Sequence, residues 1–174
     1  MNTAYVGLGS NLGNSLHVLR KAWKVLGERP GICPGRLSSP YRTEPVGMVS
    51  RHWFVNAAGS LTSSLAPFEL LQNLLAVENE FGRMRDPSAA GYQDRILDFD
   101  LLFYENCILD RSGLILPHPE IVHRLFVLLP LAEIAPEYVH PQLGRTIRVL
   151  LLELKEKKIR HPAVEKISWP ENRH

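Results

Sequence analysis

The sequence lacks several features that would point to particular classes of protein. It has only two cysteines, Cys33 and Cys107, without metal-ligand spacing, so no disulfide framework is predicted. The longest apolar run, residues 125–129, is far too short to span a bilayer, and no secretory leader is recognisable. The net charge is only +2 and the basic residues are dispersed, which does not favour nucleic-acid binding. We therefore expect a cytoplasmic protein with free thiols that binds neither membrane nor nucleic acid.

The length of the chain indicates its domain organisation. At 174 residues it can bury a substantial core without disulfides or a structural metal. We expect one domain over residues 1–174, with a monomer favoured. The polar tail over residues 159–174 is expected to pack loosely or to be mobile.

Hydrophobic periodicity predicts strands and helices in a definite order. Strands are predicted over residues 3–8, 32–39, 54–61 and 95–104. One helix is predicted between Gly13 and Pro30, and another from Pro67 to Gly82. After these come a hairpin turn at 105–106, a helix that starts at Pro119 and is interrupted near Pro130, and a helix over 145–158. The pattern predicts an α+β fold with a ferredoxin-like βαββαβ core, a mainly antiparallel sheet, an extra hairpin and C-terminal helices.

Two carboxylates interrupt the apolar strand over residues 95–104. Asp98 and Asp100 share one face of that strand, with Cα atoms roughly 6–7 Å apart. Two unpaired like charges beside a core are unfavourable, whereas a pair of Mg²⁺ ions would make them a binding site. Arginines shortly before the strand, among them Arg83 and Arg85, add donors for a polyphosphate. A solvent-facing edge strand is the alternative interpretation of the same spacing.

Other polar residues are less specific when each is considered by itself. The segment from Gly7 to Gly13 lacks the Lys-Ser/Thr of a phosphate loop and is interpreted as a strand-to-helix turn with a capping residue. His118 precedes a predicted helix, where a histidine is more often a cap or a surface residue. Asn56 differs because it lies on an apolar strand. A buried amide there needs partners and offers a donor and an acceptor to a flat heterocycle.

Together these segments are similar to the 6-hydroxymethyl-7,8-dihydropterin pyrophosphokinase family of folate biosynthesis. The resemblance covers most of the chain through segments in matching order and spacing: residues 9–13, 39–47, 54–58, Glu78 with 82–85, Arg95 with Asp98 and Asp100, and 117–126. Members of this family transfer diphosphate from ATP to the pterin hydroxymethyl group and release AMP. The resemblance implies that Asp98 and Asp100 bind two Mg²⁺ ions that bridge the ATP triphosphate.

The resemblance also implies roles for residues around the carboxylates. The catalytic set would be Arg83, Arg95, Asp98 and Asp100. The residues that meet ATP would be Glu78, Arg85, Leu101, Ile115, His118 and Arg124. The pterin would contact Thr43, Pro45, Val46, Gly47, Phe54, Asn56, Tyr92 and Phe126, with Phe126 on one side and a loop aromatic on the other.

The sequence departs from the family pattern in the segment that precedes Arg95. Many relatives have a tryptophan and a further arginine there, whereas this chain has neither within residues 86–94. Tyr92 is our candidate for the aromatic that covers the pterin, and we expect residues 83–94 to close as a lid.

Two further classes of protein remain as alternatives. In a nucleotidyltransferase the paired acids usually follow the Gly-Ser turn within one short helix, whereas some eighty residues separate them here. The products would distinguish the two: AMP from the kinase and pyrophosphate from the transferase. A non-catalytic ferredoxin-like binding module would need neither the paired acids nor the arginines, and turnover of ATP would exclude it.

Overall fold

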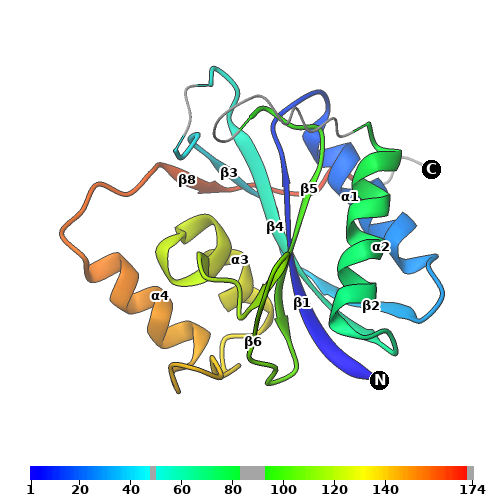
Figure 1. Ribbon diagram of the computed structural model, residues 1–174. Helices are drawn as coiled ribbons and strands as arrows, with labels where there is room; N and C mark the ends of the chain where they lie inside the picture. The colour runs from blue at the N-terminus through cyan, green and yellow to red at the C-terminus, as the bar shows by residue number, and fades with distance from the viewer. Residues whose placement is uncertain (48–49, 83–92, 172–174) are drawn as a thin grey trace.

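An antiparallel sheet forms the centre of the computed structural model, which describes residues 1–47, 50–82 and 93–171 (Figure 1). The strands are β1 (Asn2–Ser10), β2 (Ile32–Leu37), β3 (Tyr41–Thr43), β4 (Phe54–Ser63), β5 (Asp98–Tyr104) and β8 (Val164–Lys166). They lie in the order β5-β1-β4-β3-β8, and β2 also pairs with β4. Every pair is antiparallel, so the predicted α+β class with an antiparallel sheet is confirmed.

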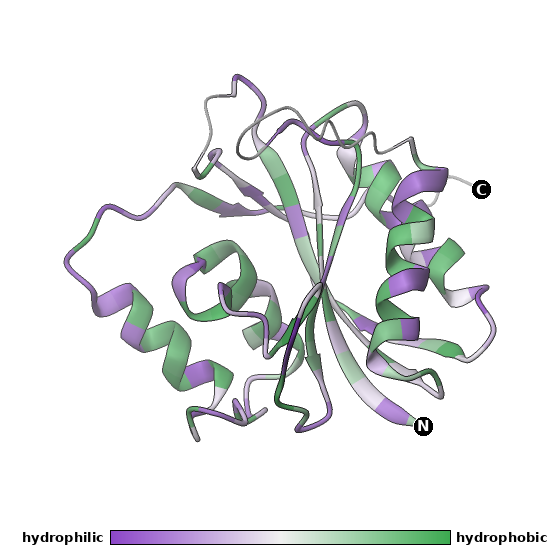
Figure 2. Cartoon of the chain, viewed as in Figure 1, coloured by the Kyte–Doolittle hydropathy of each residue, from purple (hydrophilic) through white to green (hydrophobic). Residues whose placement is uncertain are grey.

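Helices cover both faces of this sheet, as Figure 1 shows. On one face lie α1 (Ser15–Gly27) and α2 (Pro67–Glu80), and on the other lie α3 (Leu125–Ile134) and α4 (Ile147–Glu156). A short 3₁₀ helix, η1 (Ile121–His123), precedes α3, and a small hairpin of β6 (Leu109–Arg111) and β7 (Leu114–Leu116) follows β5. Figure 2 shows apolar residues along all four helices, and the buried ones belong to two hydrophobic clusters.

The two helices on the first face form where the periodicity places them. The side chain of Asn14 accepts a hydrogen bond from the His17 amide at 3.2 Å and caps α1. Pro67 occupies the first turn of α2, where its missing N–H leaves no hydrogen bond unmade. Leu19 on α1 and Leu70 on α2 are fully buried in the same core.

Three predicted elements differ in the structure. The strand expected over 32–39 ends at Leu37 as β2, which pairs with the last part of β4, and after Pro40 a strand that was not predicted, β3, pairs with the first residues of β4. The chain turns at Glu105, which has a positive φ, but the hairpin that follows pairs β6 with β7 and not with β5. Helix α3 continues through Pro130, because its largely buried apolar residues offset one missing hydrogen bond.

The last part of the chain returns to the sheet. Residues Val164–Lys166 form β8 beside β3, and the indole N–H of Trp169 donates to the Ser38 carbonyl at 2.9 Å. No helix within the described ranges is long and apolar enough to cross a membrane.

Candidate active site

Two rows of side chains cross three neighbouring strands on the face covered by α3. One row is Asn56, Gly9 and Asp98, and the other is Ala58, Gly7 and Asp100. All six residues line the same cavity, which has a volume of about 390 Å³. In these two rows the central strand β1 contributes only glycines, so the cavity floor lies open between the Asn56 amide of β4 and the carboxylates of β5.

Gly9 illustrates why the central strand carries no side chain here. A Cβ atom at this position would lie 3.1 Å from the Asn56 Oδ1 atom, closer than most real Cβ contacts. At Gly7 an added Cβ would meet only ordinary contacts of 3.6 Å or more, and would fill part of the cavity. The backbone of β1 can therefore lie directly under a ligand.

Asp98 and Asp100 occupy the boundary between this cavity and a second one of about 630 Å³. Arg95 forms an ion pair with Asp98, and the Nε2 atom of His118 lies 3.9 Å from an Asp100 carboxylate oxygen. Burial and the nearby charge of Asp98 raise the pKa of Asp100, and the positive charges around it offset this only in part. A metal cation bound beside Asp100 would lower the pKa of this carboxyl and so oppose the effect of burial.

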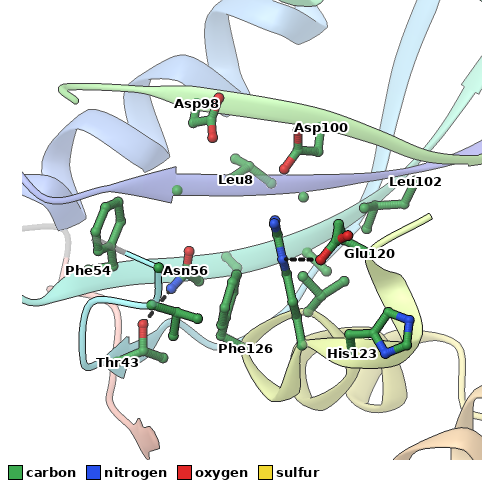
Figure 3. Close-up of a pocket in the computed structure, with 18 of the residues that line it drawn as sticks. Leu8, Thr43, Phe54, Asn56, Asp98, Asp100, Leu102, Glu120, His123 and Phe126 are labelled. Carbon is green, nitrogen blue, oxygen red and sulfur yellow. Dashed lines mark hydrogen bonds and ion pairs between the residues drawn. The ribbon is translucent and has the colours of Figure 1, made fainter. Parts of the chain in front are cut away.

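The first cavity combines aromatic and amide groups (Figure 3). Asn56 is 8% exposed, and its Nδ2 atom donates to Thr43 Oγ1 at 2.8 Å. Phe54 and Phe126 also line the cavity, together with Val46 and other residues of the turn after β3. Apolar rings around a few fixed polar groups are typical of a site for a flat heterocycle.

The second cavity has a more polar lining. It includes Leu101 from β5, and also Ile115 and His118 from the segment that follows. Arg124 lines both cavities, and its Nε atom lies 3.3 Å from a carboxylate oxygen of Glu120. Arginines beside carboxylates suit an anionic ligand that arrives with metal ions.

Asn11 fixes the chain immediately before β5. Its side chain accepts a hydrogen bond from the Arg95 amide at 2.7 Å and donates to the Asp94 carboxylate at 2.6 Å. Its own amide donates to the Arg95 carbonyl at 3.0 Å. The Gly7–Gly13 segment, which the sequence predicts as a turn with a cap, therefore also positions Arg95 next to the carboxylates.

The structure brings most of the predicted site residues together, but not all of them. Glu78 and Pro45 line neither cavity. Glu78 is only 1% exposed, and one of its carboxylate oxygens accepts a hydrogen bond from the Phe99 amide at 2.6 Å. Arg83, Arg85 and Tyr92, and the predicted lid from 83 up to 92, lie outside the described residues.

Several lining residues were missed in the sequence analysis. Gly7 and Gly9 were interpreted as part of a turn, although glycine at alternate positions of a strand signals close backbone approach. Glu120 and His123 line the first cavity because η1 turns both toward it, and no sequence pattern pointed to them.

The carboxylates do not form a complete metal cage. Within the part of the chain that the structure describes, no group of three or more histidine, cysteine or acidic residues could hold a metal ion. Mg²⁺ in phosphoryl-transfer enzymes typically takes one or two carboxylates and completes its shell with substrate phosphates and water. Asp98 and Asp100 fit this mode of binding.

Paired carboxylates, neighbouring arginines and two adjoining cavities form the arrangement of an enzyme that transfers a phosphate-containing group. Comparison with known proteins gives the particular family. The model of the 7,8-dihydro-6-hydroxymethylpterin-pyrophosphokinase (HPPK) family matches residues 5–136.

Named relatives agree with this match. A 2-amino-4-hydroxy-6-hydroxymethyldihydropteridine pyrophosphokinase from Methylorubrum extorquens is 40% identical over 88% of this chain and 94% of its own length. The proteins of the same name from Synechocystis and Bacillus subtilis are 44% and 40% identical, over 85% and 78% of this chain and 74% and 80% of their own. The chain therefore belongs to the HPPK family and is a diphosphokinase of folate biosynthesis.

Solved structures share the fold. The HPPK-DHPS protein of Plasmodium falciparum with pteroate has a TM-score of 0.69 and 16% identity, and the match covers 87% of this chain. An HPPK-DHPS crystallised with substrates gives a TM-score of 0.68 at 15% identity over 90% of this chain. This chain spans less than half of those longer chains, 44% and 45% respectively.

Proposed function

We propose that the two adjoining cavities bind the two substrates of one reaction, the transfer of diphosphate from ATP to the hydroxymethyl group of 6-hydroxymethyl-7,8-dihydropterin. The observation that carries this proposal is that Arg95, Asp98, Asp100 and Arg124 line both cavities. A group that passes from one ligand to the other must cross such a shared boundary. The pterin hydroxyl oxygen forms a bond to the β-phosphorus and gives up its proton to solvent, the bond from that phosphorus to the α,β-bridging oxygen breaks, and AMP leaves with that oxygen.

Asp98 and Asp100 would hold two Mg²⁺ ions in this site. The ions would supply charge neutralisation to the triphosphate oxygens. Arg95 reaches Asp98 in the structure, which supports a role for this arginine at the transferred group. Arg124 is placed to exchange its contact with Glu120 for a phosphate oxygen, and His118 would contact the nucleotide from the second cavity. Arg83 and Arg85 complete the proposed set of arginines.

The first cavity would hold the pterin ring. Asn56 would read the ring edge, and its bond to Thr43 fixes the amide orientation so that the Oδ1 atom accepts from the ligand. Phe54 and Phe126 supply aromatic walls, and Val46 and Gly47 supply the turn. Pro45 would act by shaping that turn, and Tyr92 remains our candidate for the cover.

The test is a product analysis. AMP and the pterin diphosphate should form only when Mg²⁺, ATP and the hydroxymethyl pterin are all present. Asp100→Asn should abolish turnover and leave the thermal midpoint near that of the wild type, because it removes a metal ligand and relieves repulsion. Full activity of this variant at ordinary Mg²⁺ would refute the metal assignment.

Asn56→Ala tests the pterin assignment separately. It should weaken pterin binding by about 1–3 kcal/mol, because polar groups of the ligand lose a partner. The affinity for an ATP analogue should stay within twofold of the wild type. Calorimetry in which ATP binding is lost and pterin binding is intact would reverse the assignment of the two cavities.

We also propose that residues 1–174 form a single cytoplasmic domain that works as a monomer with a ferredoxin-like core. The strand order β5-β1-β4-β3, with helices after β1 and β4, supports the split βαβ arrangement. Sedimentation of the purified protein at assay concentrations tests the monomer, and a dimer mass would contradict it.

A further inference from the structure

The C-terminal strand β8 lies beyond residue 136, where the match to the family model ends. We propose that β8 is a positioning element for the pterin cavity, because it holds the β3 strand and the turn after it in place. This inference rests on the proposed function, which assigns the first cavity to the pterin. Its consequence is that a change in β8 alters pterin affinity without altering ATP affinity.

Backbone contacts join β8 to β3 along its whole length. The pairing is antiparallel, with Arg42 opposite Glu165. On one side of the paired residues, the Glu44 amide donates to the Ala163 carbonyl at 3.1 Å, and the Ala163 amide donates to the Glu44 carboxylate at 3.0 Å. On the other side, the Ile167 amide donates to the Pro40 carbonyl at 2.9 Å. Both ends of β3 are therefore held.

The segment held in this way forms one wall of the first cavity. Thr43, the last residue of β3, accepts the hydrogen bond from Asn56, and Glu44 lines the same cavity. A three-residue strand has few hydrogen bonds of its own and is marginal without neighbours on both sides. Pairing with β8 raises the fraction of molecules in which this wall is formed.

A partly buried carboxylate connects the same strands to the opposite wall. Glu133 on α3 accepts a hydrogen bond from the Tyr41 hydroxyl at 2.9 Å and lies 3.2 Å from the Lys166 ammonium. The first turn of α3 carries Phe126, which lines the cavity from the other side. Strand β8 thus contacts both elements between which the pterin would lie.

The proposed ATP-binding groups are far from β8 in the sheet. Asp98 and Asp100 belong to β5 at one edge, whereas β8 forms the other edge, with β1, β4 and β3 between them. The second cavity has no lining residue from β3 or β8. Loss of β8 pairing should therefore leave ATP binding intact, which separates positioning from general destabilisation.

The test uses a proline in the full-length chain. Glu165→Pro removes the amide that faces β3 in the middle of β8, whereas Glu165→Ala keeps the amide and serves as the matched control. Pterin affinity is measured by calorimetry with saturating non-hydrolysable ATP analogue, and the affinity for the analogue is measured alone. If pairing falls to about one molecule in ten, the apparent pterin Kd rises about tenfold. The analogue Kd, and kcat at saturating pterin, should stay within twofold, and the alanine control should match the wild type.

Hydrogen exchange of the Ile167 amide reports whether β8 has detached. Rapid exchange in Glu165→Pro with an unchanged pterin Kd would overturn the proposal, and so would parallel losses of pterin and analogue affinity. If Glu165→Pro does not fold, or if Ile167 stays protected, the double variant Lys166→Ala/Trp169→Phe is compared in the same way. It removes the ion pair to Glu133 and the indole bond to Ser38, and it should raise the pterin Kd about threefold. An unchanged Kd in that variant would also overturn the proposal.

Failure of the proposed function has a different signature. If the wild type does not bind the pterin, or if Asn56→Ala binds it normally, the cavity assignment is wrong irrespective of β8. If both behave as expected, the β8 variants test the positioning role alone.

Discussion

Glu78 provides the sharpest test of how the carboxylate pair is held. The family resemblance implies that this residue meets ATP, but its side chain is buried and accepts a hydrogen bond from the Phe99 amide, between Asp98 and Asp100. Strand β5 forms one edge of the sheet, so this amide finds its partner on α2 and not on another strand. We predict that Glu78 acts by fixing β5 and not by contact with the nucleotide.

The magnitude follows from that hydrogen bond. Glu78→Ala leaves a buried backbone donor without this acceptor, and hydrogen bonds that involve a charged group contribute about 1.5–3 kcal/mol. For a chain of this length we expect the thermal midpoint to fall by about 4–10 °C. Glu78→Gln keeps a side-chain oxygen that can accept from Phe99, so its loss should be less than half of the loss in the alanine variant.

The assay combines unfolding with kinetics. Urea unfolding gives the free energy of each variant, and initial rates give kcat and the KM for ATP. We expect Glu78→Ala to lower kcat, because the two carboxylates lose their fixed backbone, and Glu78→Gln to keep the wild-type KM for ATP. A Glu78→Gln variant of wild-type stability with a tenfold higher KM for ATP would refute this reasoning and favour direct contact.

Three further predictions concern other parts of the molecule. Arg95→Ala should lower kcat far more than it raises either substrate Kd, because its contact is made chiefly in the transition state; equal effects on kcat and Kd would contradict this. Gly59→Ala should lower the unfolding free energy by about 1–3 kcal/mol, because the added Cβ would lie 2.3 Å from the Trp23 ring, and a Gly59→Ala/Trp23→Leu double variant should recover part of that loss. Burial alone would raise the pKa of Glu133, but hydrogen bonds from Ser39 and Tyr41 and the contact with Lys166 outweigh it and lower the pKa below 4.5. The stability that Glu133 contributes is therefore present above pH 4.5 and is lost as the pH falls through the pKa of this carboxyl in the folded state. Unfolding free energies measured from pH 6 to pH 3 should consequently fall more steeply in the wild type than in Glu133→Gln.

The elements that were predicted well carry strong local signals. Alternating apolar residues and a proline in the first turn give the type and position of β1 and α2. The division between β2 and β3 depends on which part of β4 each segment pairs with, and no local pattern specifies such a partner. The same holds for β8, because its polar sequence forms a strand only where β3 offers a free edge.

The residues of the candidate site could likewise be predicted only where they leave a local signal in the sequence. Asp98 and Asp100 were identified because charges in an apolar strand conflict with burial, and this conflict is visible in the sequence. Glu120 and His123 are ordinary surface residues by sequence, and they join the cavity only because η1 packs against α3 and α4. The family resemblance implies that Glu78 meets ATP, and only the packing of α2 shows that its carboxylate faces a strand.

The short length of β8 has a consequence for the solubility of the protein. An uncovered sheet edge can pair with strands of other molecules and start aggregation, and short strands with charged side chains prevent this. Strand β8 has three residues, of which Glu165 and Lys166 are exposed charges, and it covers the edge of β3. Strand β8 therefore leaves an edge with which strands of other molecules do not readily pair, and this protects the sheet from intermolecular β-pairing.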